Sequence, residues 1–133
     1  MQIIDKLAWI HTDNGKILST RSKGKDAYYI PGGKREVGES DWQTLSREIR
    51  EELSIDLVED TLKSAGVYEA QAHGKNEGVI VRMTCYFAEY RGDIKPCSEI
   101  EEVRWLGYDE GRSISSPVDQ IIFDDLHVQG TLQ

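Results

Sequence analysis

Residues 33–55 read GKREVGESDWQTLSREIREELSI, a loop that begins with glycine and is followed by the pattern of an amphipathic helix. Ser40 can cap the helix N-terminus, and Gln43 stands at the third helical position, which is the spacing of a capping box. Four apolar residues then recur at helical intervals and define one face: Trp42, Leu45, Ile49 and Leu53. The segment therefore predicts a helix that begins after Ser40 and packs against the rest of the chain by this face.

The same helix carries three carboxylates close together. Glu48, Glu51 and Glu52 stand at positions i, i+3 and i+4, within a sector of roughly 100° beside the apolar face. Like charges at this spacing repel each other, and the helix dipole disfavours anions near the C-terminus, so a cation should compensate them. Oxygen ligands favour Mg²⁺ or Mn²⁺. The alternative is a solvated helix face that Arg47 and Arg50 neutralise.

An ion pair could hold the preceding loop against this helix. Glu39 precedes the helix cap and Arg47 lies on the helix, so a contact between them would brace the loop and orient Glu48. The Pro-Gly-Gly turn at residues 31–33 can bring backbone carbonyl groups close to a cation that the glutamates hold. These features favour a metal site over a plain solvated face.

This segment resembles the Nudix box, the pattern Gly-x5-Glu-x7-Arg-Glu-U-x-Glu-Glu-x-Gly-U, in which U is a bulky aliphatic residue. It matches at all fixed positions but one, namely at Gly33, Glu39, Arg47, Glu48, Ile49, Glu51, Glu52 and Ile55. Ser54 occupies the position of the last glycine, where a left-handed serine would cost on the order of 1 kcal/mol. The resemblance extends to the strand that ends at Arg21, to Tyr-Ile-Pro-Gly-Gly at 29–33 and to Glu-Ile-x-Glu-Val-x-Trp at 99–105.

Nudix hydrolases cleave nucleoside diphosphates linked to another group, so the resemblance implies an α/β/α sandwich with a mixed β-sheet between helices. It also implies metal-assisted attack of water on a phosphorus atom of a P–O–P bridge. The implied metal-binding set is the carbonyl of Gly32 with Glu48, Glu51 and Glu52. Glu39 and Arg47 are the implied bracing pair.

The implied general base lies either in the box or on a later loop. The loop candidates are Glu99 and Glu102, and a solvated acidic stretch is the alternative for each. Related enzymes often use an arginine at the position of Arg21, which makes it the first candidate to bind substrate phosphates. The further phosphate candidates are Lys23, Lys34 and Arg35, and a solvated position is the alternative for each of the two lysines. The candidates for stacking on a base, each with a core position as the alternative, are Tyr28, Tyr68 and Trp9.

The N-terminal third is predicted to be rich in strands. Residues 2–10 and 17–20 have an extended pattern and are joined by Asp-Asn-Gly at 13–15, which predicts a β-hairpin. Residues 21–26 are polar and predict a loop. Residues 27–30 predict a short strand that stops at the following proline.

The remainder predicts three more strands and a second helix. Residues 79–88 form a β-branched and aromatic run typical of a central strand, with 67–72 as its hairpin partner, and 102–106 alternate as a further strand. The final helix opens at Ser116 and Pro117, and its expected buried residues are Val118, Ile121, Ile122 and Leu126. Several strands with two separated helices again predict an α/β/α sandwich.

Composition limits the class of protein. A chain of 133 residues predicts one domain over residues 1–133. The net charge of −8 argues against binding to a nucleic-acid polymer. No apolar run reaches membrane-spanning length, and residues 1–6 lack the features of a secretory signal, so we expect a cytoplasmic protein that does not bind membranes.

Cysteine and histidine usage argues against disulfides and zinc. Cys85 and Cys97 do not form a C-x-x-C pair and suit reduced, buried thiols. The histidines, which show no ligand spacing, are His11, His73 and His127.

We therefore expect a Mg²⁺-dependent pyrophosphohydrolase, with Mn²⁺ as a substitute, that is a monomer or a homodimer. No proline lies between Pro31 and Pro96, which disfavours the ADP-ribose hydrolases of the family, and Tyr68 lies too near the box for the dinucleoside-polyphosphate hydrolases. The expected substrate is a (d)NTP, a damaged one included, or a small nucleotide conjugate. The alternative is a catalytically silent Nudix-like module that senses or binds a nucleotide, although such a module would be expected to lose box carboxylates and none is lost here.

Overall fold

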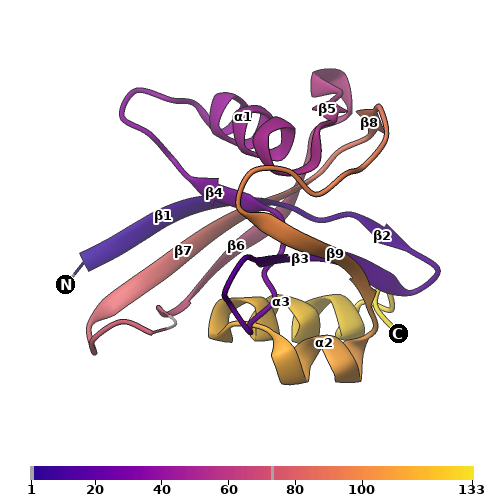
Figure 1. Ribbon diagram of the computed structural model, residues 1–133. Coiled ribbons are helices and arrows are strands. Elements are labelled where there is room, and N and C mark those ends of the chain that lie inside the picture. Colours follow the sequence, from indigo (N-terminus) through magenta and orange to yellow (C-terminus); the bar gives the residue numbers. More distant parts are fainter. Residues whose placement is uncertain (1, 73) are drawn as a thin grey trace.

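A mixed four-stranded sheet in the order β4-β1-β7-β6 lies at the centre of the molecule (Figure 1). Its strands are β1 (Gln2–Trp9), β4 (Gly32–Lys34), β6 (Lys63–Gln71) and β7 (Val79–Phe87). Strand β1 runs parallel to β7 and antiparallel to β4, and β7 runs antiparallel to β6. The structure, a computed structural model, describes residues 2–72 and 74–133, so His73 lies outside the described residues.

Two smaller sheets and the helices complete the described part of the chain. One sheet has the order β2-β3-β9, and its strands are β2 (Thr12–Asp13), β3 (Lys16–Ser22) and β9 (Ile100–Leu106). The other pairs β5 (Asp56–Leu57) with β8 (Tyr90–Arg91). The helices are α1 (Asp41–Leu53), α2 (Tyr108–Ile114) and α3 (Pro117–Val128), with a 3₁₀ turn at Glu59–Thr61. None of the described helices is long and apolar enough to cross a membrane.

The sheets lie between α1 on one side and α2 with α3 on the other (Figure 1). Strand β1 shows why, because its residues alternate between two apolar cores. Leu7 and Trp9 pack in the core that contains the buried face of α1, whereas Ala8 and Ile10 pack in the core that contains α3. The predicted α/β/α sandwich with a mixed sheet is confirmed.

Helix α1 begins and ends as its sequence predicts. The Ser40 hydroxyl accepts a hydrogen bond from the Gln43 amide at 3.1 Å, and the Gln43 side chain accepts one from the Ser40 amide at 2.9 Å. Leu45, Ile49 and Leu53 are fully buried. The helix ends at Ser54, which has a left-handed conformation with φ 60° and ψ 33°. The capping box, the buried face and the left-handed end are therefore all present.

The predicted hairpin between residues 2–10 and 17–20 is wrong in its pairing. The turn forms at Asn14 and Gly15, but it joins only the short β2 to β3, while β1 pairs with β4 and β7. Strand β1 is apolar on both faces near its C-terminal end, which is the pattern of a central strand rather than of a hairpin arm.

Two neighbouring predictions also need correction. Residues 21 and 22, predicted as loop, continue β3 and pair with β9. The strand predicted at 27–30 forms only isolated bridges, from Tyr28 to Ser115 and from Tyr29 to Thr20. A single bridge at each position does not make a regular strand.

The C-terminal half agrees better with its sequence pattern. Strand β7 is central, β6 is its hairpin partner, and β9 covers the strand predicted at 102–106. Helix α2 was missed because its seven residues include Gly111 and show no apolar period. A Cβ on Gly111 would stand 2.7 Å from the Phe123 ring, so close packing explains the glycine. Ile121 of α3 was predicted to be buried but is 42% exposed, whereas Phe123 is fully buried.

Both cysteines are free thiols. Cys85 is buried as predicted. Cys97 was also predicted to be buried but is half-buried, because it lies on the loop before β9.

Candidate active site

A cavity of about 770 Å³ lies between the central sheet, α1 and the start of α3. Three glutamates line it at one end, of which Glu48 and Glu52 come from α1 and Glu99 from the loop before β9. An apolar wall is formed by side chains that include Ile30, Ala72, Val81, Met83 and Val118. The lysines in its lining are Lys6, Lys25, Lys34 and Lys75. The cavity thus joins an acidic end, several cations and an apolar wall.

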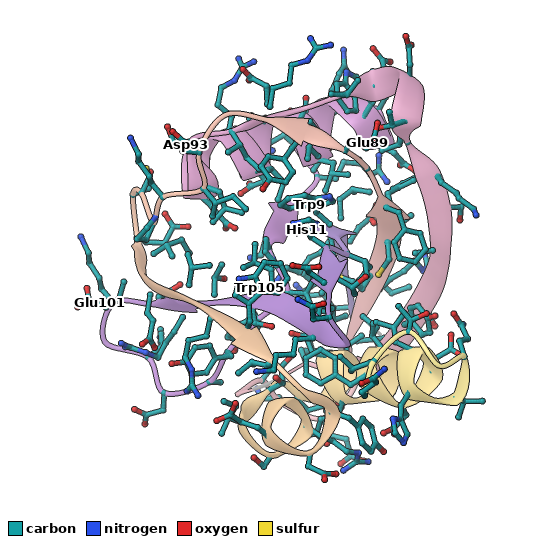
Figure 2. The ribbon with its side chains drawn as sticks, turned by 90° about the vertical axis from the view of Figure 1, so that its right-hand side faces the viewer. Trp9, His11, Glu89, Asp93, Glu101 and Trp105 are labelled. Atoms are coloured by element: carbon teal, nitrogen blue, oxygen red, sulfur yellow. The ribbon has the colours of Figure 1, made fainter. Side chains whose placement is uncertain are left out.

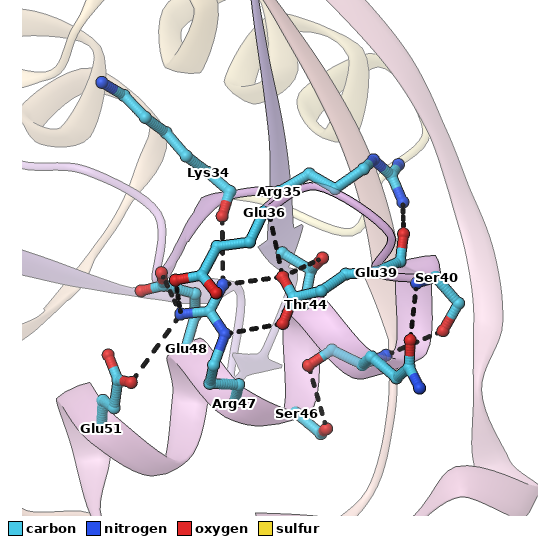
Figure 3. A network of polar contacts seen from close by, with 11 residues as sticks. Lys34, Arg35, Glu36, Glu39, Ser40, Thr44, Ser46, Arg47, Glu48 and Glu51 are labelled. Atoms are coloured by element: carbon cyan, nitrogen blue, oxygen red, sulfur yellow. Dashed lines mark hydrogen bonds and ion pairs between the residues drawn. The ribbon is translucent and has the colours of Figure 1, made fainter.

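Arg47 is the centre of the polar network beside this cavity (Figure 3). Its guanidinium donates to both carboxylate oxygens of Glu39, from Nε at 2.8 Å and from Nη2 at 2.9 Å. Nη1 donates to the Glu48 carboxylate at 2.9 Å. Nη2 also donates to the backbone carbonyl of Lys34 at 3.2 Å. Hydrogen bonding to Arg47 lowers the pKa of Glu39 to about 2. The ion pair expected between loop and helix is therefore present.

Glu48 packs against the glycine loop. A Cβ on Gly33 would overlap the Glu48 carboxylate, so the position requires glycine. The Glu48 side chain is only 15% exposed, and burial raises the pKa of this carboxyl despite its bond to Arg47. The charges of Glu51 and Glu99 raise the pKa further. Glu48 is thus held in a site that has excess negative charge.

Glu52 is the most buried carboxylate of the acidic end, with 7% of the residue exposed. Its Oε1 accepts a hydrogen bond from the Gly32 amide at 3.2 Å. Gly32 has φ 153°, and a Cβ there would overlap the carbonyl oxygen of Leu7. Burial raises the pKa of Glu52 to about 8, and Glu48 and Glu99 add to the effect. Among the described residues, no basic side chain forms an ion pair with Glu52.

Glu51 stands apart from this pair. Its side chain is 54% exposed, does not line the cavity and lies 3.7 Å from Nη1 of Arg47. In the described part of the chain, no three acidic, histidine or cysteine side chains converge as a metal-binding cluster. The structure therefore brings together Glu48 and Glu52, but not Glu51, of the three glutamates predicted to act together.

The donor set nevertheless fits a divalent cation. Glu52 is a buried carboxylate without an ion-pair partner among the described residues, and Glu48 and Glu99 face the same cavity. Oxygen donors of this kind are those that Mg²⁺ and Mn²⁺ prefer, and a cation would relieve the repulsion that raises the pKa of Glu52. Glu48, Glu52 and the backbone around Gly32 are the groups that would hold the metal.

The loop that carries Glu99 is bound to the C-terminal end of α1. The amides of Lys95 and Cys97 donate to the carbonyls of Leu53 and Glu52 at 3.0 and 2.9 Å, and the Ser98 hydroxyl donates to that of Glu51 at 3.3 Å. These bonds use carbonyl groups that a helix end leaves unpaired. They also place Glu99 near Glu48 and Glu52, whose pKa values it raises.

Glu102, the second candidate for the general base, is not in the cavity lining. Its carboxylate accepts a hydrogen bond from the Tyr28 hydroxyl and forms an ion pair with Arg21 at 3.5 Å. Arg21 also donates to the carbonyl of Lys25 at 3.2 Å and is likewise absent from the lining. Tyr28 is 6% exposed and packs in a core. The structure thus joins Arg21, Tyr28 and Glu102 to one another and not to the cavity glutamates Glu48, Glu52 and Glu99.

Of the other predicted substrate residues, only Lys34 lines the cavity. Lys23 is exposed outside the cavity lining, and Arg35 pairs with Asp5 at 2.9 Å and with Asp41 at 2.6 Å. Trp9 is fully buried and stacks on His11, with 4.6 Å between the ring centroids, and Trp105 lies beside His11 (Figure 2). Tyr68 is half-buried and donates to Asp125. Neither Trp9 nor Tyr68 lines the cavity.

Sequence reasoning missed three of the cavity lysines. Lys25 and Lys75 lie in polar loops, where nothing in the sequence marks them. Lys6 is different, because it stands between Ile4 and Ala8 on one face of β1, where its neighbours on that face are apolar. A charged residue on the inward face of a central strand is a signal that sequence reading could have used.

The chain belongs to the Nudix family, since the family model described as the NUDIX domain matches residues 5–124. A search of curated protein sequences found no match. Solved structures share the fold. The Escherichia coli ORF135 protein has 24% identity and TM-score 0.77 over 98% of this chain and 92% of that one. A MutT NUDIX hydrolase from Burkholderia pseudomallei has 21% identity and TM-score 0.75, with 93% and 98% of the chains covered. A MutT protein from Methanosarcina mazei Go1 has 19% identity and TM-score 0.76, with 97% and 96% covered.

The family defines the class of enzyme. The chain is a Nudix hydrolase, which acts on phosphorus anhydrides, and the family cleaves nucleoside diphosphate derivatives in general. Nudix hydrolases generally use divalent metal ions.

Proposed function

We propose that this protein is a Mg²⁺-dependent pyrophosphohydrolase that cleaves the P–O–P bridge of a (d)NTP, damaged ones included, or of a small nucleotide conjugate. The observation that carries the proposal is the composition of one cavity, in which buried Glu52 and its neighbour Glu48 face four lysines and an apolar wall. A pyrophosphate is repelled by carboxylates alone, whereas a cation between them joins the two sets of anions.

The residues in and beside the cavity have different roles in this proposal. Glu48 and Glu52 bind the metal, and Arg47 with Glu39 keeps the glycine loop and Glu48 in position. A bound divalent ion would offset the charge of the pyrophosphate and activate a water molecule for attack on phosphorus. The exposed lysines Lys25 and Lys34 attract the phosphate chain into the cavity.

Glu99 is the general base that the structure favours over Glu102. It lines the cavity beside Glu48 and Glu52, whereas Glu102 is paired with Arg21 and Tyr28 outside the lining. Its loop is hydrogen-bonded to the end of α1, so the carboxylate has a defined place relative to the metal-binding pair. A carboxylate at this place can accept the proton of the attacking water.

The apolar wall supports a nucleoside as the other half of the substrate. Ile30, Val81, Met83 and Val118 contribute to it, and none of them belongs to α1 or to the loop that carries Glu99. Apolar walls with a few polar groups are typical of sites that bind planar organic groups such as a nucleobase. The cavity volume of about 770 Å³ lies within the range of roughly 300–1,000 Å³ that is typical of pockets for drug-sized ligands.

The test is a release screen over the (d)NTPs, oxidised (d)NTPs and nucleoside diphosphate conjugates, with Mg²⁺, Mn²⁺ or excess EDTA. For the (d)NTPs, phosphate is measured directly and after added inorganic pyrophosphatase, which separates cleavage at the terminal bridge from cleavage next to the nucleoside. For the conjugates, whose cleavage releases two phosphate monoesters, phosphate is measured after added alkaline phosphatase. The proposal expects turnover of at least one substrate that EDTA abolishes. A flat screen together with tight nucleotide binding would instead establish a silent binding module.

A further inference from the structure

Lys6 occupies a position in the cavity that the roles above do not use. It lies on β1 opposite Lys34 of β4 and Met83 of β7. The side chains of the other three cavity lysines belong to exposed residues, whereas Lys6 is half-buried. Its Nζ lies 5.5 Å from the centroid of the Tyr29 ring, and no hydrogen bond or ion pair of Lys6 is found among the described residues. The ammonium group therefore has capacity to bind a ligand.

The positive charge of Lys6 affects the pKa values of two buried carboxyl groups. The ammonium of Lys6 acts to lower the pKa of Glu52 and of Asp119, although burial raises both. Asp119 is fully buried in the first turn of α3, next to the cavity residues Ser116, Pro117 and Val118. Lys6 thus lines the cavity, and its charge acts both on Glu52 and on Asp119.

We propose that Lys6 binds the phosphate chain of the substrate and that its charge opposes the divalent cation that Glu52 would hold in the same cavity. This inference rests on the proposed function, because it assigns a specificity-determining residue to that same cavity. Two cations near one carboxylate repel each other, so the ammonium disfavours metal binding at Glu52. The ammonium forms no ion pair among the described residues, so it can pair with an anionic ligand, and charge-assisted hydrogen bonds to phosphate are strong.

The proposal makes a prediction of opposite sign for the two ligands. Replacement of Lys6 by Met keeps the length and apolar stem of the side chain but removes the charge. Metal binding should then become tighter, because a competing cation is gone, whereas phosphate binding should become weaker. A merely structural role, through the contact with Tyr29, predicts that both ligands bind more weakly as the fold is damaged.

The experiment compares the wild type with three variants and needs no turnover. Lys6→Met is the test variant, and Lys6→Arg keeps the charge. Lys63→Met is the matched control, because Lys63 is an exposed strand lysine on β6 outside the cavity lining. Binding of Mn²⁺ alone is measured from the spin-resonance signal of the free ion at fixed ionic strength. Binding of imidodiphosphate, a P–N–P analogue of pyrophosphate, is measured by calorimetry at saturating Mg²⁺.

We expect Lys6→Met to bind imidodiphosphate about tenfold more weakly, the loss typical of one charged hydrogen bond. We expect it to bind Mn²⁺ about threefold more tightly, because one repulsive charge is removed. Lys6→Arg and Lys63→Met should both stay close to the wild type. Unchanged imidodiphosphate binding in Lys6→Met, or weakened Mn²⁺ binding, would overturn the proposal. Failure of the proposed function shows elsewhere, as a wild type that hydrolyses nothing in the release screen.

Discussion

Arg47 holds Glu39 through two parallel hydrogen bonds of 2.8 and 2.9 Å and reaches Glu48 with a third of 2.9 Å. One guanidinium therefore joins the loop before α1 to the first of the two carboxylates that face the cavity. The fork of Arg is matched to a carboxylate in a way that an ammonium is not. The position of the Glu48 carboxylate therefore depends on Arg47 as well as on the space that Gly33 leaves for it.

Arg47→Lys tests that dependence while the positive charge is kept. We expect kcat/KM to fall by about 100-fold, because a lysine cannot donate to Glu39 and Glu48 in the same geometry. Arg50→Lys is the control, since Arg50 lies on the same helix but pairs with Asp56 at the surface. Steady-state kinetics of both variants are the measurement. Equal rates for the two would show that Arg47 has no positioning role.

Ser54→Gly tests the one departure from the family pattern. Ser54 is exposed and has φ 60°, a conformation that glycine adopts without strain. We expect the free energy of unfolding to rise by about 1 kcal/mol, with unchanged kinetics. Ser54→Ala is the control and should give no gain, because alanine has the same Cβ. Denaturant unfolding of the three proteins decides, and a Gly variant no more stable than the Ala variant would refute the strain argument.

Glu99→Gln tests the assignment of the general base. We expect kcat to fall by about 100-fold at neutral pH with little change in KM, because a proton acceptor is removed and the shape is kept. Glu101→Gln is the control, since Glu101 is exposed on β9 at the edge of the molecule and does not line the cavity (Figure 2). Full activity of Glu99→Gln would return the base to the box carboxylates.

Asp119→Asn tests how a buried acid outside the metal-binding end makes the free energy of unfolding depend on pH. Asp119 Oδ2 accepts from the Ile30 amide at 2.8 Å, Oδ1 has no hydrogen-bond partner among the described residues, and burial raises the pKa to about 7. An acid whose folded pKa is raised contributes its full stability below its ordinary pKa, and that stability is lost as the pH rises to the folded pKa. The wild type should therefore lose stability between about pH 4 and pH 7 relative to Asp119→Asn, by at most about 4 kcal/mol. Unfolding free energies across this range are the measurement, and a difference independent of pH would contradict the account.

The sequence predicted α1 well because the features that define this helix lie close together along the chain. The cap at Ser40, the apolar period and the end at Ser54 each depend on neighbours within a few residues. The pairing of β1 depends instead on β7, more than seventy residues away, and the nearby turn at Asn14 and Gly15 suggested a closer partner. Register and partner choice in a sheet are set by tertiary packing, which a turn signal cannot report.

The candidate site divides in the same way. The contact of Arg47 with Glu39 and Glu48 followed from spacing on one loop and one helix. The separation of Glu51 from the other glutamates did not, because helical position alone does not show which residues the cavity meets. Nor could spacing show that Glu102 is paired with Arg21 across β3 and β9, since that contact depends on strand register.

The central claim is that the buried carboxylates of the cavity bind a divalent cation, and Glu52→Gln tests it without a substrate. The ionised form of Glu52 is disfavoured by burial and by Glu48, with a pKa raised to about 8. Near pH 8.5 and without metal, the neutral variant should therefore melt at a higher temperature than the wild type. It keeps an oxygen for the Gly32 amide, so the comparison isolates the charge.

The deciding measurement is a series of thermal melts of the wild type and Glu52→Gln at increasing Mg²⁺ and fixed ionic strength, with Glu101→Gln as an exposed control. Mg²⁺ that binds only the folded state should raise the melting temperature of the wild type and of the control, whereas Glu52→Gln should gain little. The account predicts that the curves of wild type and Glu52→Gln cross as Mg²⁺ is added. Curves that stay parallel over the whole series would contradict a metal site at Glu52.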